Sequence, residues 1–132
     1  MNQYICDLKE VIKEARSAFR KGNVQELRAL SDRAVDCTAL YQDKYSIATA
    51  VMIYSLSKLL NKESSFTHEQ WNKFHKNILI EIKNAENSLT QNNIKGYGVA
   101  LKKALMLIKS IDEKTSNYIR AQGDCIYLCG EV

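Results

Sequence analysis

Proline is absent from the 132 residues of this chain, although proteins contain roughly 5% proline on average. Because proline interrupts helices and stiffens linkers, its absence leaves the chain free to form long, uninterrupted helices. This absence is the strongest compositional feature of the chain, and it is compatible with a helical fold.

A long apolar run is missing as well. The most apolar stretch runs from Tyr45 to Ser57 and is shorter than the roughly 20 residues that cross a bilayer, so it predicts a buried helix. Charges at Asp7, Lys9 and Glu10 fall where a secretory signal would have its apolar core. We therefore expect no contact with a membrane and a cytoplasmic location.

Cysteine is too sparse and too scattered for a disulfide scaffold, with residues at Cys6, Cys37, Cys125 and Cys129. We expect reduced thiols that act as small, partly buried apolar residues. Cys125 and Cys129 are four residues apart, so on a helix they could share a metal ion if the other two cysteines came close. Because those two are isolated from each other, we expect neither a metal nor a cofactor.

Residue patterns that carry catalysis are also missing. His68 and Glu69 begin a zinc-protease pattern, but it requires a second histidine four residues after the first, where this chain has Asn72. His75 follows His68 by two helical turns, too far for both rings to hold one ion. No nucleophile lies in a recognisable pattern with a base, and no glycine-rich loop opens a helix. The sequence predicts no catalytic residue and gives no positive indication of an enzyme.

The residues that are present have the balance of a folded globular protein. Hydrophobic residues make up 45% and charged residues 26% of the chain, which excludes the composition typical of disorder. The length suits one hydrophobic core, so we predict a single domain over residues 1–132. The formal net charge is +4, which permits binding to nucleic acid without requiring it.

Apolar residues recur at helical spacing along the chain. They predict helices over residues 2–21, 24–42, 44–61, 67–91 and 94–111, and a sixth helix, or a continuation of the fifth, over residues 112–132. The predicted fold class is all-α: a single-domain antiparallel bundle of five or six helices. The helix over 44–61 is apolar nearly all round, which predicts that other helices surround it.

Local signals mark where these helices begin and end. Gly22 can adopt the left-handed conformation that stops a helix. Asn23 with Glu26, and Thr67 with Gln70, have the three-residue spacing of a capping box at a helix start. We therefore expect the first two helices to form an antiparallel hairpin.

Charged residues are sorted along the first helix, with basic and acidic residues on opposite flanks of its apolar stripe. The basic flank forms a ridge of Lys9, Lys13, Arg16 and Arg20. A second ridge follows the fifth helix at heptad spacing, with Lys95, Lys102 and Lys109. If the ridges were neighbours, they could neutralise several phosphates of a nucleic acid, and the same residues are candidates for contact with a partner. The alternative is that they are ordinary solvated helix faces.

Three short segments resemble the first helical hairpin of HEPN-type domains. They are residues 27–34 (LRALSDRA), 39–50 (ALYQDKYSIATA) and 54–60 (YSLSKLL). The resemblance implies a helical bundle related to RNases or to partners of nucleotidyltransferases. The nuclease members carry an arginine followed by four to six residues and a histidine; because no arginine here has a histidine at that distance, RNase activity is not implied.

The function predicted from these features is a non-catalytic interaction module that binds another protein or a second copy of itself. One alternative is a HEPN-like domain without the nuclease motif. The other is non-specific binding of RNA or DNA through the basic helix faces.

Overall fold

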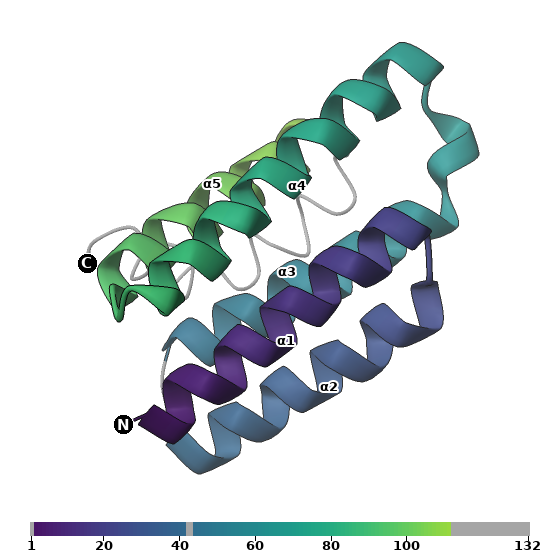
Figure 1. Ribbon diagram of the computed structural model, residues 1–132. Coiled ribbons are helices and arrows are strands. Elements are labelled where there is room, and N and C mark those ends of the chain that lie inside the picture. Colours follow the sequence, from purple (N-terminus) through teal and green to yellow (C-terminus); the bar gives the residue numbers. More distant parts are fainter. Residues whose placement is uncertain (1, 42–43, 112–132) are drawn as a thin grey trace.

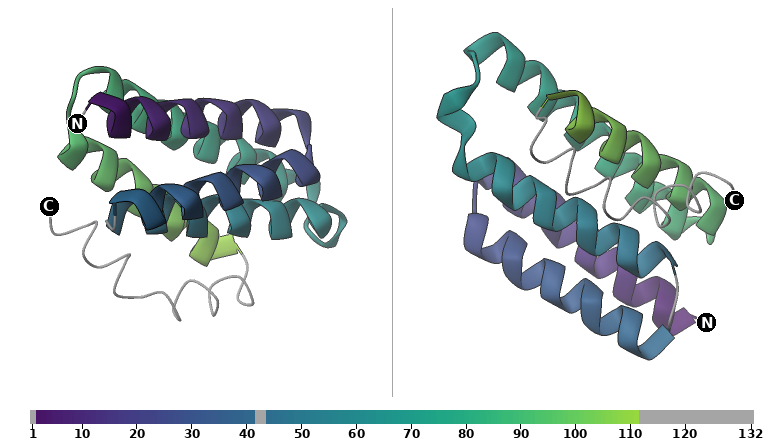
Figure 2. Two further views of the ribbon diagram at one scale, coloured as in Figure 1. Left: turned by 90° about the horizontal axis from the view of Figure 1, so that it is seen from below. Right: turned by 180° about the vertical axis from the view of Figure 1, so that it is seen from behind.

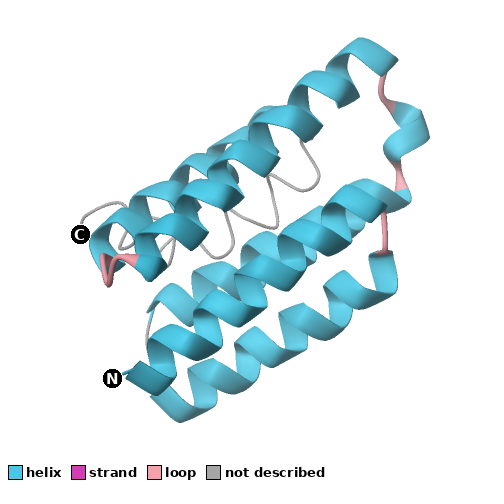
Figure 3. Ribbon diagram, in the orientation of Figure 1, coloured by secondary structure: helices cyan, strands magenta, loops and turns pink. Residues whose placement is uncertain are grey.

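The protein is built from α-helices, and the computed structural model describes residues 2–41 and 44–111, with side chains for 6–36 and 44–111. These ranges form helices joined by short connections and contain no β-strand (Figure 1, Figure 3). The elements are α1 (Asn2–Lys21), α2 (Val24–Tyr41), α3 (Lys44–Asn61), the 3-10 turn η1 (Glu63–Ser65), α4 (His68–Thr90) and α5 (Ile94–Ile111). The all-α prediction is confirmed, whereas the predicted sixth helix lies outside the described residues.

The connection between α1 and α2 reverses the chain at a glycine. Gly22 has a φ of 73°, which costs little at a residue without a Cβ. The amide of Gly22 donates to the Phe19 carbonyl (3.1 Å) and that of Asn23 to the Ala18 carbonyl (2.9 Å), the pair of hydrogen bonds of a Schellman turn. The Asn23 side chain then accepts the Glu26 amide (3.1 Å) and begins α2, as predicted.

The connection between α4 and α5 repeats this geometry with asparagine in place of glycine. Asn92 has a φ of 57°, and the Asn92 and Asn93 amides donate to the carbonyls of Leu89 (3.0 Å) and Ser88 (2.8 Å). The Asn93 side chain caps α5 by accepting the Gly96 amide (2.9 Å). A Cβ at position 96 would lie 2.6 Å from Asn93 Nδ2, so glycine makes room for this cap.

The start of α4 is a complete capping box. The Thr67 hydroxyl accepts the Gln70 amide (3.1 Å), and the Gln70 side chain accepts the Thr67 amide (3.1 Å). Both amides would otherwise lack a partner at the helix end. The sequence prediction of this cap is confirmed.

The helices pack as two groups, α1–α3 and the α4–α5 hairpin (Figure 2). α2 lies along α3, and α1 packs against both of them. α4 packs against α1 on one side and α5 on the other, while α5 also contacts α3. Consequently α4 lies between α1 and α5.

Helix α3 is buried on nearly every side. The central position predicted from its apolar sequence is confirmed. Its buried hydroxyls are satisfied within the fold: Thr49 donates to the Tyr45 carbonyl (2.7 Å) and Ser55 to the Val51 carbonyl (2.8 Å). Thr49 also shares a hydrogen bond with the fully buried Tyr97 hydroxyl of α5. Because buried polar groups without partners are costly, this bond fixes how α5 meets α3.

An aromatic cluster joins α1 to the first turns of α4. Phe19 of α1 is fully buried and its ring centroid lies 6.1 Å from that of Trp71 and 6.3 Å from that of Phe74. The His75 ring stacks on Phe19 at 4.9 Å between centroids. Large rings in such offset and edge contacts bury much apolar area, so the cluster fixes α4 against α1.

Candidate interaction surface

The two flanks of α1 face different helices. On the acidic flank, Glu14 pairs with Arg33 of α2 (Oε2 to Nη1, 3.2 Å), and Glu10 lies 3.7 Å from the same guanidinium. The basic flank faces α4, since Arg16 lies beside Glu86 of that helix. Each flank of α1 thus forms an ion pair with a different helix, the acidic flank with α2 and the basic flank, through Arg16, with α4.

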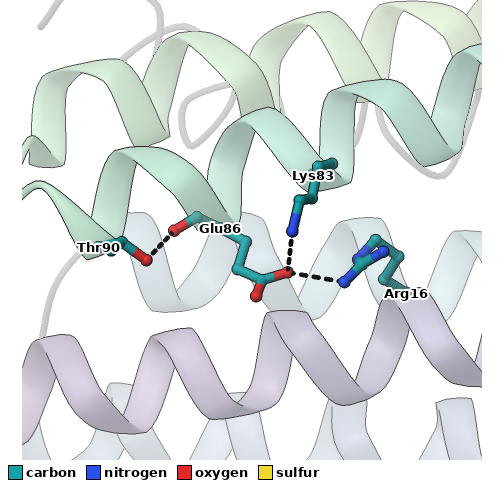
Figure 4. Close-up of polar contacts among 4 residues, drawn as sticks. All are labelled: Arg16, Lys83, Glu86 and Thr90. Carbon is teal, nitrogen blue, oxygen red and sulfur yellow. Dashed lines mark hydrogen bonds and ion pairs between the residues drawn. The ribbon is translucent and has the colours of Figure 1, made fainter.

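Arg16 is committed to an ion pair rather than free to bind a ligand. Its Nη2 lies 3.1 Å from Glu86 Oε1 of α4, and the two side chains are 25% and 11% exposed. Lys83 Nζ lies 4.0 Å from the same oxygen. Figure 4 shows the Glu86 carboxylate pointing from α4 toward α1, with Arg16 and Lys83 converging on it. The pair lies in the seam between the two groups of helices.

The remaining residues of the α1 ridge stay accessible to different degrees. Lys13 and Arg20 are exposed, and Lys9 is half-buried. Among the described residues, neither Lys13 nor Arg20 takes part in an ion pair. The part of this ridge that is open to a ligand is therefore smaller than the sequence suggests.

The second ridge lies on α5, with Lys95 and Lys102 exposed and Lys109 half-buried. α4 separates this ridge from the one on α1, so the two ridges are not direct neighbours. The intervening surface of α4 is itself basic, with exposed Lys76 and Lys83. Joint binding of phosphates was predicted on the condition that the two ridges be neighbours, and the two ridges do not contact each other directly.

A groove on the outer face of α4 and α5 gathers apolar residues that a core would bury. Among the described residues, the large hydrophobic side chains that remain exposed are Val35 (53%), Ile80 (48%), Val99 (43%) and Met106 (50%). All but Val35 line this groove, which has a volume of about 750 Å³. Its full lining is Asn77, Ile80, Glu81, Val99, Lys102, Lys103, Met106, Leu107 and Ser110. We call it the α4–α5 groove.

Sequence reasoning missed this groove because it sorted helix residues by whether they fit the apolar stripe. Val99 and Met106 fall outside the stripe of α5 and lie seven residues apart, on the same outward face. Ile80 likewise lies outside the buried stripe of α4. Apolar residues at helical spacing on a polar face were the signal that could have identified this groove.

The predicted histidine and cysteine positions do not form a metal site in the part of the chain that the structure describes. His68 is exposed and His75 stacks on Phe19. Cys6 is exposed, so the expectation of a partly buried thiol is wrong for this residue, because its position on α1 faces away from the helices packed there. The side chains of Cys37, Cys125 and Cys129 lie outside the described residues. No three potential metal-binding side chains cluster among residues 6–36 and 44–111.

The described helices also lack the combination of length and apolar character that crossing a membrane requires. Comparisons with protein-family models, curated proteins and solved structures find no match. On the part of the surface that the structure describes, the α4–α5 groove is where exposed large apolar side chains gather.

Proposed function

We propose that the protein is a non-catalytic interaction module that binds another protein through the α4–α5 groove. The observation that carries the proposal is the gathering of Ile80, Val99 and Met106, each between 43% and 50% exposed, in one groove. Single exposed hydrophobic residues are common on proteins, but a cluster of them in a concave site is typical of binding surfaces.

Capture of partners from a lysate of the native host tests this function. The tagged full-length chain is compared with Met106→Glu, which places a charge in the groove, and with Val35→Glu, which makes the same change at a similarly exposed residue of α2. Both variants are first checked for unchanged helical content by circular dichroism. We expect a protein that persists after nuclease treatment, is retained by Val35→Glu and is lost from Met106→Glu. Equal capture by all three proteins would contradict the proposal.

A second candidate function is non-specific binding of nucleic acid, supported by the sign of charge on α5. This helix carries four lysines and no acidic residue. Binding to phosphates would weaken steeply as salt is raised, whatever the nucleic-acid sequence.

The test of this second function uses labelled single-stranded RNA and fluorescence anisotropy over a range of salt concentrations. Because Arg16 is engaged by Glu86, the informative changes are Lys13→Glu with Arg20→Glu on α1, and Lys95→Glu with Lys102→Glu on α5. Loss of affinity together with a shallower salt dependence supports phosphate contact. Unchanged affinity in both double variants rules against it.

The HEPN-like relationship stays a prediction from the three short sequence segments. A cleft lined by Arg33, Asp36, Tyr41 and Tyr54 would favour this relationship. The guanidinium of Arg33 lies beside Glu10 and Glu14. An RNA-cleavage assay of the purified chain addresses this alternative, and turnover that disappears on Arg33→Ala would favour it over an interaction module.

A further inference from the structure

The lining of the α4–α5 groove combines apolar residues, here called its floor (Ile80, Val99, Met106 and Leu107), with the lysines Lys102 and Lys103. These two chemical characters together specify a partner. We propose, resting on the protein-binding function above, that the groove receives an amphipathic helix with an acidic polar face from another protein. The apolar face of that helix would occupy the floor, and its carboxylates would face the lysines of α5.

The floor suits the side chains of one helix face. From Val99 to Ser110 the α5 wall spans eleven residue steps, or roughly 16 Å, which is three turns of a docked helix. A helix anchored at positions i, i+3 or i+4, and i+7 presents its apolar residues over that length. Met106 is half exposed there, and its flexible thioether side chain adapts to different apolar partners.

The charged residues that line the groove are mainly basic. Lys102 and Lys103 line it from α5, and Glu81 of α4 is its only carboxylate among the described lining residues. Neither lysine has an ion-pair partner within the described residues. α4 and α5 together carry seven lysines and three glutamates, a surplus of four positive charges that equals the formal net charge of the whole chain.

Of these charges, the groove lining itself holds Lys102, Lys103 and Glu81, which leaves it a net charge of +1. Glu86 belongs to the seam with α1, where Arg16 engages it, so it does not neutralise the groove. A complementary partner is therefore acidic, because opposite potentials accelerate encounter and disfavour neutral or basic helices.

The same features argue against the other occupants. A second copy would bring two basic faces together, which costs energy through repulsion of like charges. Nucleic acid gains little from an apolar floor on which no aromatic ring of the described residues is available for stacking. A bilayer surface is flat on this scale and cannot follow a concave groove.

A selection experiment tests the proposal without assuming a partner sequence. A displayed library of random helical peptides of about 18 residues, five turns long, is selected on the full chain and depleted on Met106→Glu. We expect the enriched peptides to have a net negative charge and apolar residues at the helical spacing given above. Enrichment of basic or neutral peptides, or of sequences without that spacing, would overturn the proposal.

Binding of the most enriched peptide is then measured by fluorescence anisotropy. Met106→Glu should weaken binding by at least about tenfold, since it leaves a charge in an apolar contact. Lys102→Glu with Lys103→Glu should weaken it by a similar factor at low salt and by less at high salt. The control variants are Val35→Glu for the apolar change and Lys13→Glu with Arg20→Glu for the charge change, and both should stay within about twofold of the original. Equal losses in the controls would refute a role for the groove.

The outcome separates this proposal from the proposed function on which it rests. If a host protein is captured in a Met106-dependent way but the selected peptides are not acidic, the protein-binding function stands and the acidic-helix proposal fails. Met106-dependent dimerisation in sedimentation velocity, or RNA binding that is lost in the Lys102 and Lys103 double variant, would each replace the acidic helix with a different occupant.

Discussion

Replacing Arg16 by methionine should destabilise the fold specifically through the seam between α1 and α4. Methionine keeps most of the apolar stem of arginine but removes the guanidinium that lies 3.1 Å from Glu86. The carboxylate, whose side chain is 11% exposed, then retains only Lys83 at 4.0 Å. A buried carboxylate that loses its partner is costly, because the fold still excludes water from it.

The magnitude follows from the geometry of the pair. At 3.1 Å and an effective dielectric constant of about 20, two unit charges attract by about 5 kcal/mol. The cost of removing both groups from water is several kcal/mol and offsets most of this attraction. Arg16 Nε and Glu86 Oε1 also lack hydrogen-bond partners among the described residues, so the contact does not gain the strength of an aligned, charged hydrogen bond. We expect a coupling free energy of about 1 kcal/mol and a loss of about 2 kcal/mol for Arg16→Met.

Urea unfolding followed by circular dichroism measures these free energies in Arg16→Met, Glu86→Gln and the double variant. The control is Arg20→Met, the same change at an exposed residue of the same helix, which should alter stability by no more than about 0.5 kcal/mol. If Arg16→Met costs no more than Arg20→Met, or if the cycle shows no coupling, the ion pair does not stabilise the seam and the reasoning fails.

Three further changes probe local features of the fold by the same unfolding measurement. Asn92→Gly should stabilise the protein by about 0.5 kcal/mol, because φ is 57° there and glycine adopts this conformation at less cost than asparagine; a loss of stability would mean that the asparagine side chain contributes to the turn. Thr67→Ala should cost about 1 kcal/mol by removing the capping box of α4, whereas Thr67→Ser should retain most of it. Tyr97→Phe should cost about 1 kcal/mol, because it leaves the buried Thr49 hydroxyl without its partner on α5; a neutral result would show that the remaining bond from Thr49 to the Tyr45 carbonyl is sufficient.

The limits of the helices were predictable because they depend on residues close together in the sequence. Gly22, Asn23 and the pair Thr67 and Gln70 carry their own hydrogen-bonding chemistry, and the structure uses each of them as expected. The central position of α3 was predictable for a related reason, since a helix that is apolar all round can be stable only among other helices.

The surface features depend on which helices become neighbours, and this information is not local. Arg16 is one of four basic residues on a flank of α1, and its partner Glu86 is far away in the sequence. The groove likewise requires the outward faces of α4 and α5 to lie side by side, which brings Ile80 next to Val99 and Met106.

The two similar turns, at Gly22 and at Asn92, each join two helices that are neighbours in the sequence. Each hairpin closes its own backbone hydrogen bonds, at Gly22 and at Asn92, so side chains hold the α4–α5 hairpin to the other helices. The exposed connection through Glu63–Ser65 is the one described link of the backbone between the two groups of helices. The orientation of the α4–α5 hairpin, and with it the outward face of the groove, therefore depends on the side chains that α4 and α5 bury against α1 and α3.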